Sequence, residues 1–272
     1  MRFELEGRVV LITGASGGIG RACAVEFHRN GAKVVAAARS GDRLAELQNE
    51  LGSDRLEAVV MDVTDSEQRQ AGLDRARQRF GFIDVLVNNA GWASFGSLLH
   101  LPAEHLDRMF ALNLSAPVAM IQAVLPEMIE RRSGQIVNIS SVVGYQPLPR
   151  MAFYSATKAA LNALSSALRM ELRGSGVDVI LIAPSSTNTG FFQAAEQTDT
   201  KAIRFEKGQH PPEQVARAVV RGCRNRRKEV VLSLEGKLLT VIRRISHRLA
   251  DSIIRRVADR SMPLRESSTD EK

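Results

Sequence analysis

Cysteine is scarce in this chain of 272 residues, which contains only Cys23 and Cys223. Two cysteines so far apart provide neither a disulfide framework nor the closely spaced ligands of a metal site. We therefore expect no bound metal, and we interpret both cysteines as small buried apolar residues in a reducing compartment.

Long apolar runs are missing too. Glu4, Glu6 and Arg8 interrupt the first residues, a pattern that does not match a secretory signal peptide. The longest uncharged stretch, residues 109–126, contains Asn113 and suits a buried core helix better than a membrane span. These features favour a cytoplasmic protein, with peripheral membrane contact left open by the charge distribution.

The chain has no overall acidic character, and its positive charge is concentrated near one end. Residues 221–260 contain twelve basic and four acidic residues, a net +8 that leaves the rest of the chain near neutral against the total of +7. The basic helix expected there contains no recognised nucleic-acid module, so we expect no nucleic-acid partner.

Short apolar runs alternate with helical patterns through the first two thirds of the chain. Runs this apolar suit strands that are covered on both faces, as in a parallel sheet. We therefore predict an α/β fold: a Rossmann-like doubly wound parallel sheet flanked by helices, with a C-terminal basic helical extension. The expected strands are residues 9–12, 33–37, 56–61, 85–87, 136–139, 179–182 and 229–232, and the expected helices include residues 18–29, 65–80 and 153–173.

The domain prediction is a single catalytic domain over residues 1–234, in which residues 190–210 form a substrate lid. Residues 235–260 are predicted to form an amphipathic helix, and residues 261–272 a disordered tail. Three roles stay open for the helix: packing on its own domain, joining a second subunit, or lying on an anionic membrane surface.

A glycine-rich loop, residues 13–20, joins the first expected strand to the first helix. Gly14 permits a tight turn, Gly18 lets the backbone approach a pyrophosphate, and Gly20 lets the helix pack closely on the sheet. The spacing G-x-x-x-G-x-G differs from the commoner dinucleotide pattern, but its position at a strand–helix junction predicts a nucleotide site. The predicted cofactor contacts in this loop are Gly14, Ser16, Gly18, Ile19 and Gly20.

The second expected strand ends at Ala38 without an acidic residue, and Arg39 follows. An acidic residue there would bind the ribose hydroxyls of NAD, whereas a cation can neutralise an adenosine 2′-phosphate. The sequence therefore favours NADP(H) over NAD(H), with Arg39 as the contact and Arg43 in support. An ordinary solvated arginine is the alternative.

Tyr154 and Lys158 lie four residues apart at the start of an expected helix, so they share one face. A free tyrosine has a pKa near ~10 and is a poor base at neutral pH. A nearby ammonium and a cationic nicotinamide would lower that pKa. The pair can then act as general acid in ketone reduction and as general base in alcohol oxidation.

Taken together, the motifs resemble the short-chain dehydrogenase/reductase family, in its shorter single-domain branch. The resemblance implies an NADP(H)-dependent oxidoreductase that transfers hydride between its cofactor and a carbonyl/alcohol pair, using a Tyr-Lys-Ser-Asn tetrad. It also implies a small or lipid-like substrate and a homodimer or homotetramer. The matching motifs, in order over about residues 7–190, are Thr13-Gly14-x-x-x-Gly18-x-Gly20, Asp62-Val63, Asn88-Asn89-Ala90-Gly91, Asn113, Ser141 and Tyr154-x-x-x-Lys158.

The resemblance also implies catalytic roles. Tyr154 would transfer the proton, and Lys158 would lower its pKa and hold the nicotinamide ribose. Ser141 would hydrogen-bond the substrate oxygen, with Ser140 as the neighbouring alternative. Asn113 would hold a water that continues a proton relay through Lys158 to solvent.

Further cofactor contacts follow from the same resemblance. Asp62 and Val63 would meet the adenine, and Asn89, Ala90 and Gly91 would line the adenosine side. Asn89 has an equal structural interpretation, since its amide can tie strands together.

After the sixth strand, the family pattern of Pro-Gly is replaced by Pro184-Ser185. A serine would be strained if that position required a positive φ. Thr187 and Thr189 complete the predicted cofactor contacts, and Thr189 is placed to bond the nicotinamide carboxamide.

The substrate cannot be assigned at this stage, because no Arg or Lys near the catalytic motifs stands out as an anion anchor. The predicted lid contains the apolar residues Phe191, Phe192, Ile203 and Phe205. Further candidates for apolar walls are Trp92, Phe95, Leu148, Met151 and Phe153, with ordinary packing as the alternative. Two other functions stay open: a non-catalytic NADP(H)-binding sensor, and a peripheral membrane enzyme acting on a lipid-like substrate.

Overall fold

Seven parallel strands form the central sheet of the computed structural model, which describes residues 2–198, 210–233, 238, 242 and 245–261. The strand order β3-β2-β1-β4-β6-β7-β9 confirms the predicted doubly wound topology. The strands are β1 (Val9–Thr13), β2 (Lys33–Ala38), β3 (Leu56–Val60), β4 (Val85–Asn88), β6 (Gly134–Ile139), β7 (Val177–Ala183) and β9 (Glu229–Val231).

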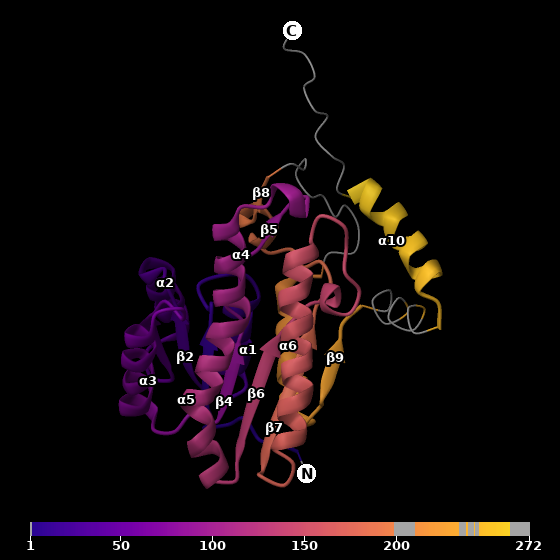
Figure 1. The fold of residues 1–272 in the computed structure, drawn as a ribbon. Coiled ribbons are helices and arrows are strands. Elements are labelled where there is room, and N and C mark those ends of the chain that lie inside the picture. The colour runs from indigo at the N-terminus through magenta and orange to yellow at the C-terminus, as the bar shows by residue number, and fades with distance from the viewer. Residues whose placement is uncertain (1, 199–209, 234–237, 239–241, 243–244, 262–272) are drawn as a thin grey trace.

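Helices cover both faces of this sheet (Figure 1). Alternate residues of each strand point to opposite faces, so the apolar strands feed two separate cores. One core joins the sheet to α1, α2 and α8, and the other joins it to α3, α5 and α6. These helices are α1 (Gly18–Arg29), α2 (Gly41–Leu51), α3 (Ser66–Phe80), α5 (Ala116–Glu130), α6 (Ala152–Glu171) and α8 (Pro212–Arg224). Cys23 and Cys223 are free and fully buried in the first core, as predicted.

The topology fixes where a ligand can bind. β1 pairs with β2 on one side and with β4 on the other, and β4 pairs with β6, so the chain leaves β1 and β4 in opposite directions. The loops that follow β1 and β4 therefore diverge at the carboxyl edge of the sheet and leave a crevice between them.

One long helix runs from Ala103 to Glu130, through α4 (Ala103–Phe110), a π-helical turn (Ala111–Ser115) and α5. Among the described residues it is the one helix long and apolar enough to cross a membrane by length and composition. Its apolar side chains, including Met120 and Val124, pack against the sheet, in agreement with the predicted core helix.

The C-terminal extension was predicted as one helix over residues 235–260, of which residues 235–237, 239–241 and 243–244 lie outside the described residues. Helix α10 spans His247–Ser261, and Ser246 interrupts the helical conformation that Ile245 still has. Serine favours the cap position, and the Ser246 carbonyl accepts from the Ala250 amide as the helix begins. Residues 199–209 of the predicted lid and 262–272 of the predicted tail lie outside the described residues.

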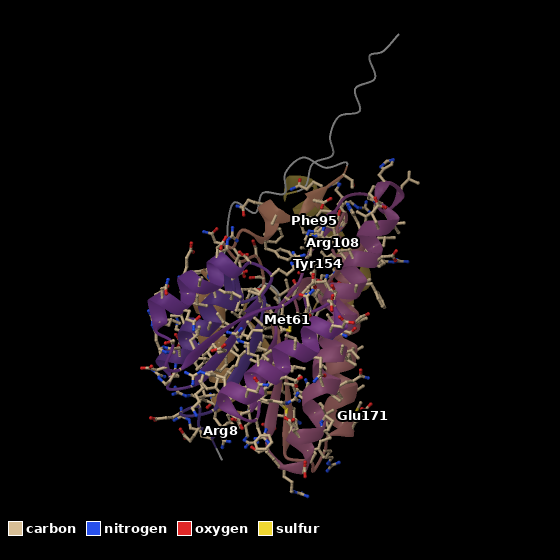
Figure 2. The ribbon with its side chains drawn as sticks, turned by 90° about the vertical axis from the view of Figure 1, so that its left-hand side faces the viewer. Arg8, Met61, Phe95, Arg108, Tyr154 and Glu171 are labelled. Carbon is tan, nitrogen blue, oxygen red and sulfur yellow. The ribbon has the colours of Figure 1, made fainter. Side chains whose placement is uncertain are left out.

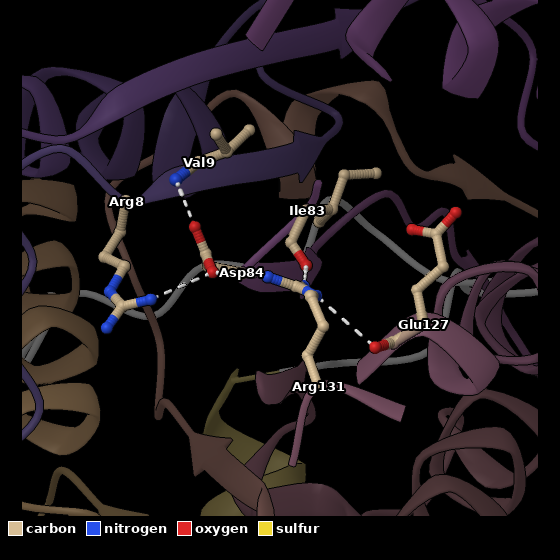
Figure 3. Close-up of polar contacts among 6 residues, drawn as sticks. All are labelled: Arg8, Val9, Ile83, Asp84, Glu127 and Arg131. Carbon is tan, nitrogen blue, oxygen red and sulfur yellow. Dashed lines mark hydrogen bonds and ion pairs between the residues drawn. The ribbon is translucent and has the colours of Figure 1, made fainter. Parts of the chain in front are cut away.

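At the amino-terminal ends of the strands, away from the crevice, Asp84 joins three segments of chain (Figure 3). Its carboxylate accepts from the Val9 amide at 3.0 Å, from Arg8 at 3.2 Å and from Arg131 at 3.1 Å. Arg131 also donates to the Ile83 carbonyl at 2.9 Å. This buried carboxylate therefore fixes the start of β1 against β4 and the end of α5.

Replacing Asp84 tests this anchor. Asp84→Ala leaves the Val9 amide without its acceptor and two arginines without their counter-ion, so we expect a loss of about 2–3 kcal/mol of unfolding free energy. Asp84→Asn keeps an acceptor oxygen and should lose about 1 kcal/mol. Urea unfolding followed by circular dichroism measures both. The exposed Asp107→Ala serves as control and should change stability by less than about 0.5 kcal/mol; equal losses in Asp84→Ala and the control would contradict the anchor.

Candidate active site

A cavity of about 570 Å³ opens at the carboxyl edge of the sheet. It brings together sixteen of the predicted site residues, which come from six separate loops and from α6. These are Gly14, Ser16, Gly18, Ile19, Arg39, Asp62, Val63, Asn89, Ala90, Gly91, Ser141, Tyr154, Lys158, Pro184, Thr187 and Thr189. Two predicted residues, Gly20 and Asn113, lie behind its wall. Among the described residues, no group of three or more potential metal ligands occurs.

The glycine loop forms a cradle with little room to spare. Gly14 and Gly18 have φ angles of +69° and +53°, a backbone conformation that side chains disfavour. A Cβ on Gly18 would lie 3.0 Å from Thr189, in the space that a bound group would need. A Cβ on Gly20 would lie 2.2 Å from the Gly14 carbonyl oxygen. Gly20 therefore shapes the loop from behind, rather than only allowing the helix to approach the sheet.

Asn89 ties the loops after β1 and β4 together. Its side-chain amide donates to the carbonyl oxygens of Thr13 at 2.9 Å and Gly14 at 3.2 Å. The Thr13 hydroxyl accepts from the amides of Asn89 and Ala90, both at 3.0 Å. The structural interpretation of Asn89 is therefore supported, although the residue also lines the cavity.

Charged groups gather where β2 and β3 end. Arg39 lies 3.8 Å from the Asp62 carboxylate and keeps two thirds of its side chain exposed. Burial opposes the charge on Asp62, but hydrogen bonds from the Thr64 hydroxyl at 2.7 Å and amide at 2.8 Å prevail, and the pKa of this carboxyl is lowered. Asp62 is therefore ionised at neutral pH, and Arg39 retains free donors that face solvent and the cavity.

Tyr154 and Lys158 meet at the middle of the cavity. Burial raises the pKa of the Tyr154 phenol above its usual value, and a hydrogen bond with Ser141 opposes that rise. Burial lowers the pKa of the Lys158 ammonium to about 8. Nζ of Lys158 donates to the Ile139 carbonyl at 3.0 Å and lies 5.8 Å from the centre of the Tyr154 ring. The sequence predicted a lowered tyrosine pKa, but within the protein alone burial outweighs that influence and the phenol holds its proton.

The two neighbouring serines have different surroundings. Both serines follow β6 and line the cavity, and the Ser141 hydroxyl hydrogen-bonds Tyr154. The Ser140 hydroxyl instead donates to the side-chain oxygen of Asn162 and to the Lys158 carbonyl, at 2.5 and 3.3 Å. Ser140 thus joins β6 to α6, which leaves Ser141 as the hydroxyl available to a ligand.

Asn113 lies in the π-helical turn and is buried. Its amide donates to the Trp92 carbonyl at 2.9 Å and to Thr157 at 3.2 Å, and its oxygen accepts from the Trp92 amide at 2.9 Å. A Cβ on Gly91 would lie 3.2 Å from that oxygen and 3.8 Å from Nζ of Lys158. Because Gly91 has no side chain, a small space remains between Asn113 and Lys158.

The loop after β7 shows none of the strain that Ser185 could have introduced. Arg132, Arg150 and Arg226 are the non-glycine residues with positive φ in the described part of the chain, so Ser185 needs no left-handed conformation. The side chain of Thr189 packs on Gly18 and its hydroxyl accepts from the Phe191 amide at 3.4 Å.

The apolar wall is made by fewer residues than the sequence suggested. Leu148, Met151, Phe191 and Phe192 line the cavity. Trp92, Phe95 and Phe153 do not line it: they belong to, or pack against, a third apolar cluster behind the wall. Phe95, for example, is fully buried with Phe192 stacked on it at 5.9 Å between ring centres, so Phe192 lines the cavity in its place.

A second polar group lies behind this wall, and local sequence patterns do not reveal it. A short strand β5 (Ser94–Phe95) pairs in parallel with β8 (Glu196–Gln197). Glu196 accepts from His105 at 2.9 Å and from Arg108 at 3.4 Å, and Arg108 stacks over the Trp92 ring at 4.0 Å. The residues of this polar group come from three segments that are distant in the sequence, so only the fold brings them together.

The packing of Gly20 yields a stability prediction. Gly20→Ala forces a methyl group onto the Gly14 carbonyl and should cost about 1–3 kcal/mol of unfolding free energy. Gly17→Ala is the matched control, because a Cβ there meets nothing within 4 Å and the φ of −171° suits any residue. Urea unfolding compares them, and an equal effect of both substitutions would refute the packing argument.

Comparison with known proteins agrees with this geometry. The family model described as short chain dehydrogenase matches residues 8–200. An uncharacterized oxidoreductase of Staphylococcus aureus (strain USA300) is 34% identical over 216 residues, which cover 79% of this chain and 90% of the relative.

Solved structures share the whole architecture. A short chain dehydrogenase/reductase from Burkholderia phymatum in complex with NAD is 28% identical, with a TM-score of 0.83 over 91% of this chain and 96% of that one. An alcohol dehydrogenase from Thermococcus sibiricus complexed with 5-hydroxy-NADP is 28% identical, with a TM-score of 0.74 over 83% of this chain and 95% of that one. Sequence and shape agree, and the chain belongs to the short-chain dehydrogenase/reductase family of NAD(P)-dependent oxidoreductases.

Proposed function

We propose that this protein is an NADP(H)-dependent carbonyl reductase or alcohol dehydrogenase that uses Tyr154, Lys158, Ser141 and Asn113. The observation that carries the proposal is the position of the Tyr154–Ser141 pair in the same cavity as the glycine loop. A proton donor and a nucleotide cradle that share one cavity suit carbonyl chemistry with a dinucleotide, rather than cofactor sensing alone.

The lining residues fit a dinucleotide. The cradle at Gly14 and Gly18 would hold the pyrophosphate beside the N-terminus of α1, where backbone amides favour negative charge. Asp62 and Val63 would meet the adenine, and Thr189 the nicotinamide carboxamide. When bound, the cofactor supplies or accepts the hydride.

The residues of the protein itself donate and accept the proton that accompanies hydride transfer. The Tyr154 phenol, kept protonated by burial, would donate to the carbonyl oxygen during reduction, while Ser141 orients that oxygen. The Lys158 ammonium, four residues further along α6, stabilises the phenolate left behind. The space beside Gly91 suits a water that returns a proton through Asn113 and Lys158.

Arg39 supports a preference for NADP(H). Its guanidinium shares the Asp62 carboxylate only at 3.8 Å, so its remaining donors are able to bind a 2′-phosphate. Ser40 and the first turn of α2 add unpaired hydrogen-bond donors on the same side, since Ser40 makes no side-chain cap bond.

Assembly and location complete the proposal. Phe110, Ile129 and Met170 are exposed on the helices that follow β4 and β6, which supports a homodimer or homotetramer formed through those helices.

We place the enzyme in the cytoplasm. Anionic membrane contact through α10 is the second candidate, favoured by the exposed basic side chains of Arg248, Arg255 and Arg256 on that helix.

Loss of the phenol hydroxyl tests the mechanism. Tyr154→Phe should reduce kcat for carbonyl reduction by about 100-fold or more, because the general acid is removed. NADPH affinity, measured by fluorescence titration, should change little. Tyr145→Phe is the matched control at the only other tyrosine, outside the cavity lining, and should retain activity. Near-normal turnover in Tyr154→Phe would refute the assignment.

Cofactor preference is tested at Arg39. Arg39→Ala should weaken NADPH binding by about 10-fold or more and NADH binding by far less, because only NADPH carries the 2′-phosphate. Arg29→Ala, exposed at the end of α1, should leave both affinities unchanged. An equal loss of affinity for the two cofactors would argue against the phosphate contact.

A further inference from the structure

We infer that the substrate is an uncharged, apolar carbonyl compound, or the corresponding alcohol, whose hydrocarbon part binds against Phe191, Phe192 and Leu148. This inference rests on the proposed function, because it concerns the far end of the same cavity. It follows from the distribution of charge along that cavity and from the way the apolar wall is held in place.

Charge is confined to one part of the cavity. Among its described lining residues, the charged side chains are Arg39, Arg43, Asp62 and Lys158. The first three lie at the ends of β2 and β3 and at the start of α2, on the adenosine side. Lys158 is buried against Tyr154 and donates to the Ile139 carbonyl, so it belongs to the proton-transfer group.

Beyond Tyr154 the lining is apolar. The residues there are Val142, Val143, Leu148, Met151, Phe191 and Phe192. Besides the Ser141 and Tyr154 hydroxyls, the neighbouring loop after β7 adds the hydroxyls of Ser185 and Ser186, which line the cavity and are uncharged. From the described residues, a substrate at this end therefore finds uncharged hydroxyl groups and apolar surface, and no charged side chain besides Lys158.

The aromatic wall lies directly beside the reacting phenol. The Phe191 ring centre is 5.8 Å from that of Tyr154. Phe192 stacks on Phe95 at 5.9 Å with an interplanar angle of 24°, and Phe95 meets Tyr154 edge-on at 6.0 Å. Apolar groups attached to the carbonyl carbon would thus bury surface against aromatic rings as soon as the oxygen reaches Tyr154.

One acidic and two basic side chains lie behind the wall and pair with one another. Glu196 binds both His105 and Arg108, and Arg108 is stacked on Trp92. None of these side chains lines the cavity. Figure 2 shows Arg108 beside Phe95 and Tyr154 at the upper end of the molecule, far from Arg8 and Glu171. The network therefore anchors the segment that carries Phe191 and Phe192, and supplies no free cation to a substrate.

A carboxylate bound at this end would lose its hydration without gaining a counter-ion from the described residues. A neutral ester or alkyl group at the same position is stabilised by the burial of its apolar surface. The cavity should therefore discriminate between two molecules that share one ketone and differ only in that charge.

Methyl 4-acetylbenzoate and 4-acetylbenzoate form such a pair, since both present the same aryl methyl ketone. With NADPH, we expect the ester to show a kcat/KM about 100-fold or more above that of the acid. The ester alone should raise the melting temperature of the NADPH-loaded protein. These two readouts separate binding from turnover.

A charge placed in the wall provides the matched variant. Leu148→Arg should raise the acid-to-ester ratio of kcat/KM, and of affinity for the NADPH-loaded protein, by about 10-fold or more. Leu99→Arg adds the same charge at a side chain that is 84% exposed and outside the cavity lining, and should leave the ratio unchanged. Unchanged NADPH affinity in both variants verifies that each is folded.

The outcomes are distinguishable. If the acid binds or reacts as well as the ester, or if neither binds, the inference of an apolar substrate is overturned. If the ester binds the NADPH-loaded protein but no ketone is reduced, the apolar site stands and the proposed reaction falls. An equal change of the ratio in Leu148→Arg and Leu99→Arg would also overturn the assignment of the wall.

Discussion

The hydrogen bonds between Asn89 and the β1 turn are the constraint on which the carboxyl edge of the sheet depends. The strand order makes the chain leave β1 and β4 in opposite directions, which opens the crevice but also leaves two loops without strand neighbours. The Asn89 amide and the Thr13 hydroxyl supply the missing bonds across that gap. Gly20 must lack a side chain for the same reason, since its α-carbon faces this junction. The cofactor cradle therefore exists because a polar tie closes a gap that the topology creates.

Burial has opposite consequences for the two ionisable groups at the centre of the site. It raises the pKa of the Tyr154 phenol and lowers the pKa of the Lys158 ammonium, so it presses both toward their neutral forms. A proton that leaves the phenol creates an anion beside a cation, and each then compensates the cost of burying the other. The phenolate of Tyr154 and the ammonium of Lys158 therefore stabilise each other, whereas either charge alone is disfavoured by burial. The proximity of the two groups thus matters more for proton transfer than the pKa of either group alone.

Much of the fold was readable from the sequence, because its signals are local. The first helix has the predicted bounds, Gly18–Arg29, since a glycine loop marks its start. The buried strands were visible as apolar runs, with end positions shifted by one or two residues. At the C-terminal end, helix α10 begins at His247, directly after the non-helical Ser246, and the apolar repeat of the sequence continues across Ser246 without marking that position.

The sequence predicted those site residues that belong to recognisable motifs. The sixteen lining residues were predicted because glycine turns and strand ends are local features. The pairing of Glu196 with His105 and Arg108 was not, since no pattern in one segment specifies a partner in another. The position of Trp92 and Phe95 behind the wall was missed for the same reason: their aromatic character indicates burial but not on which side of a cavity they lie.

The third apolar cluster has a consequence for how such an enzyme diverges. Phe95, Met151 and Tyr154 pack in a cluster of their own, apart from the two cores that hold the sheet. Substitutions in residues 142–151 and 191–194 therefore alter the shape of the apolar end without removing a side chain from either main core. A lineage can thus change its substrate through two short segments while both main cores and the glycine loop are inherited unchanged.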